Sequence, residues 1–133
     1  MQKKRLFICA LLAAPSLAFA FKGMSDRHIC AAGLLTAKIL SSNSAFLQAK
    51  NGVVYFDSRK PDGARITYQC KLEGNRILWK EAEGQWHDKD VDSVITFVRQ
   101  RHSDDALVIK IISPDGRTTA KDYWNDDDLW PGI

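Results

Sequence analysis

Tight-turn signals divide most of this chain into short segments, and they constrain its fold more than any other feature. Asn51-Gly52 is the dipeptide most typical of a two-residue β-hairpin, and Pro-Asp-Gly turns occur at 61–63 and 114–116. Between these turns apolar and polar residues alternate with a period of two, as in strands that bury one face. The sequence therefore predicts a series of consecutive hairpins.

We expect about seven strands, because that many alternating segments lie between turn signals. They span residues 46–50, 53–58, 66–72, 76–81, 94–101, 107–112 and 118–124. A helix should begin after the good N-cap Ser25 and continue at helical spacing to about Leu40. Because strands joined by short turns pair with their sequence neighbours, the predicted fold class is α+β. One N-terminal helix would pack on a curved antiparallel meander, or partial barrel.

Residues 1–20 have the three parts of a secretory signal peptide. Three basic residues at positions 3–5 precede an apolar run at 6–14, and Ala18-Phe19-Ala20 is a small-x-small cleavage pattern. We expect cleavage after Ala20, a single domain over residues 21–133, and a location in the periplasm or outside the cell. The apolar run is too short to span a membrane, which needs roughly 20 residues.

Removal of the signal peptide would leave a domain without net charge. The whole chain has 19 basic and 16 acidic residues, and taking away the three bases at positions 3–5 leaves 16 of each sign. Nucleic-acid binding depends on an excess of Lys and Arg, so we expect no nucleic-acid partner.

Two cysteines remain after the predicted cleavage, Cys30 and Cys70. An exported chain with two cysteines is expected to pair them. Cys70 falls on the apolar face of its predicted strand, where a helix that carries Cys30 should dock. Both patterns therefore predict a Cys30–Cys70 disulfide.

No motif in the sequence indicates a particular reaction. Asp88, Asp90 and Asp92 have the spacing that opens a calcium-binding loop, but Ser93 and Arg99 stand where such a loop needs Gly and Glu. The histidines share no metal-ligand spacing, and the sequence has no nucleophile elbow, zinc-protease motif or glycine-rich phosphate loop. We therefore assign no metal, no cofactor and no catalytic residue. A catalytic set that is assembled only by folding stays open.

The aromatic residues are the best candidates for a binding surface. We expect Trp79 to be core, as most Trp are partly buried, whereas Trp86 lies in a polar stretch and other aromatics flank an acidic run. Exposed aromatics beside charges are typical of recognition surfaces. The candidate surface consists of Trp86, Tyr123, Trp124, Asp126, Asp127, Asp128 and Trp130. In the alternative interpretation, Trp130-Pro131 folds back and caps the end of the barrel.

Several short motifs together indicate a family resemblance. They are Ile29-Cys30-Ala31-Ala32, Arg59-Lys60-Pro61-Asp62-Gly63, Tyr68-Gln69-Cys70-Lys71-Leu72, Gly74-Asn75-Arg76-Ile77 with Trp79, and Gly84-Gln85-Trp86. In these motifs the chain resembles a group of small, uncharacterised secreted or periplasmic proteins of Gram-negative bacteria. The resemblance implies the compartment and the disulfide, and it implies no activity and no catalytic residue.

The expectations together favour an exported, non-catalytic binding protein with a protein partner in the cell envelope. An inhibitor or immunity protein for an envelope enzyme or toxin would have this size, this disulfide and these aromatics beside acids. One alternative is a small periplasmic hydrolase, or a lipid- or glycan-binding module, that uses the concave face of the sheet. Another is a structural component of the envelope. The sequence gives no oligomeric state.

Overall fold

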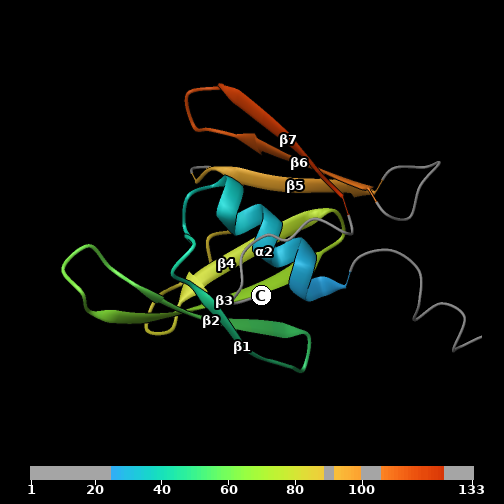
Figure 1. Cartoon of the computed structure of the whole chain (residues 1–133). Coiled ribbons are helices and arrows are strands. Elements are labelled where there is room, and N and C mark those ends of the chain that lie inside the picture. Colours follow the sequence, from blue (N-terminus) through green and yellow to red (C-terminus); the bar gives the residue numbers. More distant parts are fainter. Residues whose placement is uncertain (1–24, 89–91, 100–105, 125–133) are drawn as a thin grey trace, which may run out of the picture.

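The chain folds into one helix and one antiparallel sheet in a computed structural model that describes residues 25–88, 92–99 and 106–124. The elements are α2 (Asp26–Thr36), β1 (Ala45–Lys50), β2 (Val53–Arg59), β3 (Arg65–Glu73), β4 (Arg76–Glu81), β5 (Val94–Arg99), β6 (Ala106–Ile112) and β7 (Thr118–Trp124). The order of the strands in the sheet is their order in the sequence (Figure 1). The predicted α+β meander is confirmed, and the sheet does not close into a barrel. The predicted signal peptide lies outside the described residues.

The predicted turns join the strands as their chemistry requires. Asn51 and Gly52 both have positive φ, 54° and 79°, which is the conformation of a type I′ hairpin turn. Each Pro-Asp-Gly turn is closed by a backbone hydrogen bond from its glycine, Gly63 N–H to Lys60 O at 2.9 Å and Gly116 N–H to Ser113 O at 2.8 Å. These turns set the register of the strands on either side.

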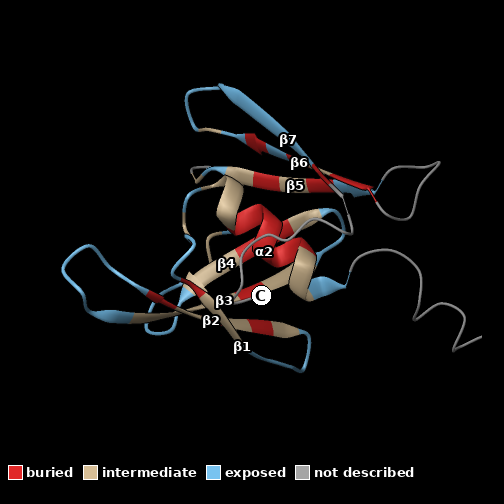
Figure 2. Ribbon diagram, in the orientation of Figure 1, coloured by how far each residue is buried: buried red, intermediate tan, exposed pale blue. Residues whose placement is uncertain are grey.

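The core lies between helix α2 and the concave face of the sheet, where Figure 2 shows the buried parts of the helix facing buried parts of the strands. Its largest fully buried side chains include Ile29, Leu34, Val54, Phe56, Ile77, Ile95, Leu107 and Ile109. The helix can approach the sheet closely because Gly33 has no side chain. A Cβ added there would lie only 2.5 Å from Ile77 Cδ1. The concave face is therefore filled by the helix.

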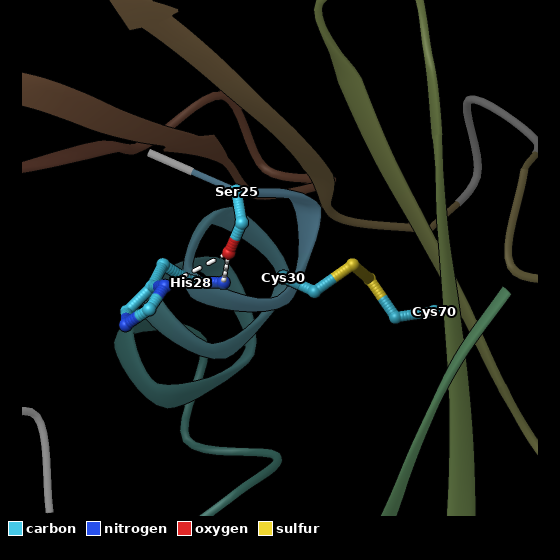
Figure 3. The surroundings of a disulfide bond; sticks show 4 residues. All are labelled: Ser25, His28, Cys30 and Cys70. Carbon is cyan, nitrogen blue, oxygen red and sulfur yellow. Dashed lines mark hydrogen bonds between the residues drawn. A yellow bond between two sulfur atoms is a disulfide. The ribbon is translucent and has the colours of Figure 1, made fainter. Parts of the chain in front are cut away.

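A disulfide joins the helix to the middle of the sheet. Cys30 on α2 and Cys70 on β3 are bonded, with 6.1 Å between their Cα atoms and 40 residues between them in sequence (Figure 3). Both residues are fully buried. The predicted pairing is confirmed.

Helix α2 ends earlier than the sequence predicts, at Thr36 rather than near Leu40. Lys38 takes a left-handed conformation with φ 64°, and the N–H groups of Ile39 and Leu40 both bond back to Leu34 O, at 2.9 and 3.2 Å. Such bonds are typical of a helix C-terminus that reverses direction. The apolar spacing continues past Thr36 because the reversed chain still directs Leu40, which is 2% exposed, into the core.

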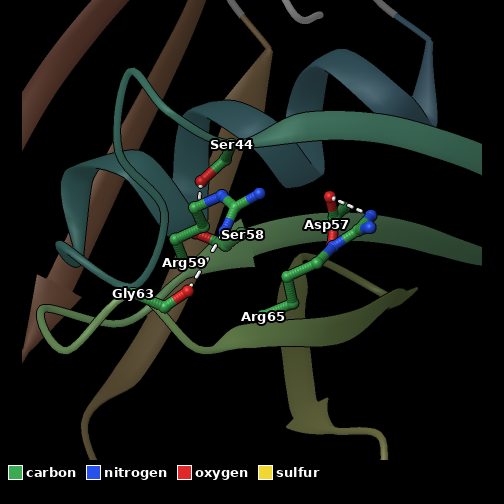
Figure 4. A network of polar contacts seen from close by, with 6 residues as sticks. All are labelled: Ser44, Asp57, Ser58, Arg59, Gly63 and Arg65. Atoms are coloured by element: carbon green, nitrogen blue, oxygen red, sulfur yellow. Dashed lines mark hydrogen bonds and ion pairs between the residues drawn. The ribbon is translucent and has the colours of Figure 1, made fainter.

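The strands β1 to β4 have two contrasting faces, which Figure 4 shows around β2. Ser58 faces the core, where its hydroxyl lies 2.7 Å from that of the buried Ser44. The preceding residue, Asp57, faces the other way and pairs with Arg65, with 2.8 Å between the carboxylate and the guanidinium. We call the face opposite α2 the outer face.

The sheet is weakest between β4 and β5. These two strands pair at Arg76↔Thr96 and Ile77↔Ile95 and then diverge, whereas β3 and β4 pair along the whole of β4. The remaining edge of β4 is followed by the chain after it, since His87 N–H donates to Trp79 O at 2.8 Å. This divergence positions the candidate site.

Candidate functional site

A cleft of about 530 Å³ opens where β4 and β5 diverge, beside the C-terminal end of α2. One part of its wall is apolar, with Trp79, Ile95 and Ile111, and the rest is polar. The polar lining consists of Thr36, Lys38, His87, Asp92, Ser93, Ser113 and Thr119. A mixed lining of this kind fits a ligand or a partner's side chain that has both an apolar and a polar part.

His87 is held in the cleft by two contacts of its ring. Its ring stacks on Trp79 with 4.0 Å between centroids and an angle of 15° between the planes. Its Nδ1 lies 3.4 Å from Asp92 Oδ1. The backbone N–H of His87 is also bonded to Trp79 O, which fixes the residue beside β4.

Trp86 and His87 lie on opposite faces of the sheet because this segment runs extended along the edge of β4. While His87 stacks on the side of the core, Trp86 lies on the outer face between two lysines. Lys71 Nζ is 4.4 Å and Lys80 Nζ is 5.6 Å from the centre of its ring. Lysine ammonium groups at such distances are attracted to the negative face of an indole.

The pair His87–Asp92 separates two hollows. Both residues line the cleft beside α2, and both also line a second, open hollow together with Gln85, Trp86 and Asp88. The segment from Gln85 to Asp88 therefore presents a polar and aromatic ridge with a depression on either side. We call residues 85–88 with Asp92 the ridge.

An aromatic row connects the ridge to the sheet. Tyr68 packs edge-on against Trp79 with 5.8 Å between ring centroids, and Trp79 in turn stacks on His87. Burial raises the pKa of the Tyr68 phenol above its ordinary value, and the nearby Glu81 raises this pKa further. Tyr68 therefore stays neutral around pH 7 and serves as packing.

The residues of the predicted binding surface do not all lie on one surface of the structure. Trp86 is on the surface and partly exposed. Tyr123 is 4% exposed, and its hydroxyl lies 2.7 Å from Thr36 Oγ1, so it belongs to the core. Trp124 is the last residue of β7. The residues Asp126, Asp127, Asp128 and Trp130 lie outside the described part of the chain.

Comparison of the chain with protein-family models, with curated proteins and with solved structures finds no match. Within the ranges that the structure describes, no helix is long and apolar enough to cross a membrane. The same residues contain no group of three or more His, Cys, Asp or Glu side chains that could hold a metal ion.

Sequence reasoning missed His87, Asp92 and the lysines around Trp86. The sequence shows His87 only as one of the histidines that share no metal-ligand spacing, and Asp92 as one member of an incomplete calcium loop. A signal was present, because Trp86 and His87 come after the short turn at 82–84, and their alternation has the same parity as that of β4. The meeting of His87 with Asp92 could not be predicted, since it depends on how the chain returns to β5.

Proposed function

We propose that the protein is an exported, non-catalytic binding protein that contacts a protein partner through the ridge and the adjoining cleft. The observation that carries the proposal is the preorganisation of the ridge. His87 is held by Trp79 and Asp92, and Trp86 by two lysines, before any partner is present. Side chains that are already ordered lose less conformational entropy on binding, and Trp is enriched among residues that dominate binding energy.

Catalysis has less support than binding. A His–Asp pair can activate a nucleophile only if a hydroxyl or thiol lies within hydrogen-bonding reach of the imidazole. In the described ranges, the polar contact of the His87 ring is the one to Asp92, and both Cys30 and Cys70 are used in the disulfide. The ridge therefore presents recognition groups without an activated nucleophile.

Export is supported by the buried disulfide, because such bonds persist mainly in oxidising compartments. A small exported domain with a preorganised surface is suited to inhibit an envelope enzyme or to neutralise a toxin. We include this role of inhibitor or immunity protein in the proposal.

Quantitative capture from the envelope fraction of the source cells tests the proposed function. Immobilised wild type should retain one saturable protein partner, and Trp86→Ala or His87→Ala should retain at least about tenfold less, as expected when a dominant contact is lost. Leu47→Ala is the matched control, because Leu47 is 49% exposed on the distant strand β1. Equal retention by all four proteins, with each variant shown to be folded by its thermal unfolding, would exclude the ridge as the binding surface.

The acidic part of the predicted surface needs its own variant. Replacement of Asp126, Asp127 and Asp128 by Asn in the same assay shows whether the C-terminal segment adds to the ridge. The sequence places these acids after β7, between Trp124 and Trp130, so weaker capture would add them to the binding surface. Unchanged capture would restrict the binding surface to the ridge.

A second candidate is a module that binds a small glycan or lipid, and the mixed lining of the cleft favours it. The helix fills the concave face of the sheet, so a ligand would occupy the cleft beside Trp79 rather than the concavity. Titration of oligosaccharides or a fatty acid, followed by tryptophan fluorescence, tests this candidate. A saturable change that Thr119→Phe abolishes by filling the cleft would favour it over a protein partner, because Thr119 is an exposed residue of the lining.

A further inference from the structure

The outer face of β1 to β4 carries an excess of positive charge. Cys70 faces the helix, so the residues that alternate with it, and their cross-strand partners, lie on the outer face. The basic residues of this face are Lys50, Arg59, Arg65, Lys71, Arg76 and Lys80. Its acidic residues on the same strands are Asp57 and Glu73, which pair with Arg65 at 2.8 Å and with Lys71 at 3.2 Å. We call this surface the basic face.

Trp86 gives the basic face a centre. Its ring lies within 4.4 Å of Lys71 Nζ and 5.6 Å of Lys80 Nζ. Leu78, the cross-strand partner of Lys71 on the same face, is 2% exposed. Two ammonium groups near one indole repel each other, and the ring offsets only part of that repulsion. Because Glu73 already pairs with Lys71 at 3.2 Å, an incoming carboxylate would mainly compensate the charge of Lys80.

A row of hydrogen-bonding side chains crosses the strands beside this centre. Tyr55 is the cross-strand partner of Gln69, and Gln69 is the partner of Lys80. The glutamine amide can both donate and accept, and the tyrosine hydroxyl can do the same. Groups that donate and accept can bond to the alternating N–H and C=O groups of an extended polypeptide. A polymer that carries only negative charges would be bound by the lysines alone. Of the described elements, α2 lies on the opposite face (Figure 1), and Tyr55, Gln69 and Lys80 are each partly exposed.

We propose that the basic face binds an acidic, extended segment of a protein partner, whose carboxylates contact Lys71 and Lys80 around Trp86. This inference rests on the proposed function and names the chemistry of the partner. Charge complementarity carries it: the chain after the predicted cleavage has 16 bases and 16 acids, and six of these bases but only two of these acids lie on this face of β1 to β4. Complementary charges of this kind mainly increase association rates and specificity, and their effect falls with salt.

Fluorescence anisotropy with a labelled peptide of alternating Glu and Ser tests the inference. We expect saturable binding that weakens as salt rises, and that Lys80→Glu weakens at least about tenfold. Lys110→Glu is the matched control, because Lys110 is an exposed lysine of the same outer surface on the distant strand β6. Trp86→Ala should also weaken binding, while Trp86→Phe should keep most of it because the aromatic ring is retained.

Three results would overturn the inference. The first is an equal effect of Lys80→Glu and Lys110→Glu, which would mean that only net charge matters. The second is tighter binding of polygalacturonate than of the acidic peptide, which would indicate an anionic glycan. The third is a captured partner that requires Trp86 but is indifferent to Lys80→Glu and to salt. In that third case the proposed function stands and the acidic partner is excluded.

Discussion

The two parts of the sheet are attached to helix α2 in different ways. Strands β1 to β4 are tied to it by the Cys30–Cys70 bond. Strands β5 to β7 are held by apolar packing and by the contact of Tyr123 with Thr36. The outer surfaces differ as well, since that of β1 to β4 is basic, whereas that of β5 to β7 exposes Val98 at 58%. The covalently fixed part thus carries the basic face, to which we assign the proposed binding.

Of the changes that test this difference between the two parts of the sheet, loss of the disulfide should lower the free energy of unfolding most. Replacing both Cys30 and Cys70 by Ala should lower the free energy of unfolding by about 4 kcal/mol, because the bond closes a loop of 40 residues in the unfolded chain. Urea denaturation of the double variant measures the change. A decrease below about 1 kcal/mol would show that packing alone holds β1 to β4 on the helix.

The second largest loss of stability should follow from a larger side chain at the point where helix α2 packs on β4 and β5. Gly33 packs against Ile77 on β4 and Ile95 on β5, so Gly33→Val should destabilise the protein by about 1–3 kcal/mol. Gly84→Ala is the control, because an added Cβ there has only ordinary contacts at 3.6 Å and beyond. Equal unfolding midpoints for the two variants would contradict the close approach of the helix.

The hydrogen bond that joins β7 to the helix should have a smaller effect. Thr36 Oγ1 donates to Ala32 O at 2.7 Å, so Tyr123 is the donor in its 2.7 Å contact with Thr36. Tyr123→Phe should therefore lower the free energy of unfolding by about 1 kcal/mol. Tyr55→Phe, on the outer face of β2, should change it little. Greater loss of amide protection in β6 and β7 than in β2 and β3 would localise the effect.

The smallest expected effect is a pH dependence at the start of the helix. Burial lowers the pKa of His28 below its usual 6.5, and the neighbouring Arg27 lowers it further. The unfolded chain therefore binds a proton at His28 more readily than the folded protein does. Stability should be complete above about pH 6.5 and should decrease as the pH falls below that value.

His28→Asn isolates this contribution. The difference in unfolding free energy between wild type and variant should shrink from pH 8 to pH 5. A difference that is constant over this range would show that folding does not lower the pKa of His28. Arg27, which lies 4.5 Å from the centre of the Phe46 ring, connects this part of the helix to β1.

Much of the fold could be predicted because its signals are local. Asn51-Gly52 and the Pro-Asp-Gly turns specify hairpins within a few residues, and the alternation around Cys70 specifies which face is buried. The end of the helix could not be predicted from spacing, since Ile39 and Leu40 are apolar whether the chain stays helical or turns back. The backbone reversal at Lys38 decides between the two, and no glycine marks it.

The candidate site was less predictable because it depends on distances across the sheet. Sequence reasoning identified Trp86, which the structure places on the surface, and also Tyr123, whose ring the structure buries. An aromatic at the end of a strand can face either way, and only the pairing of Leu107 with Tyr123 directs it inward. The cleft arises because β4 and β5 pair briefly, which no turn signal in the sequence indicates.

The position of the cysteines has a consequence for the order of folding. Wherever the chain emerges with its N-terminus first, α2, Cys30, Cys70 and the whole of β4 are available before β5 has appeared. The bond can therefore form before the last three strands have emerged. The early part then offers them a preassembled template, and each later strand needs only to add to a growing edge.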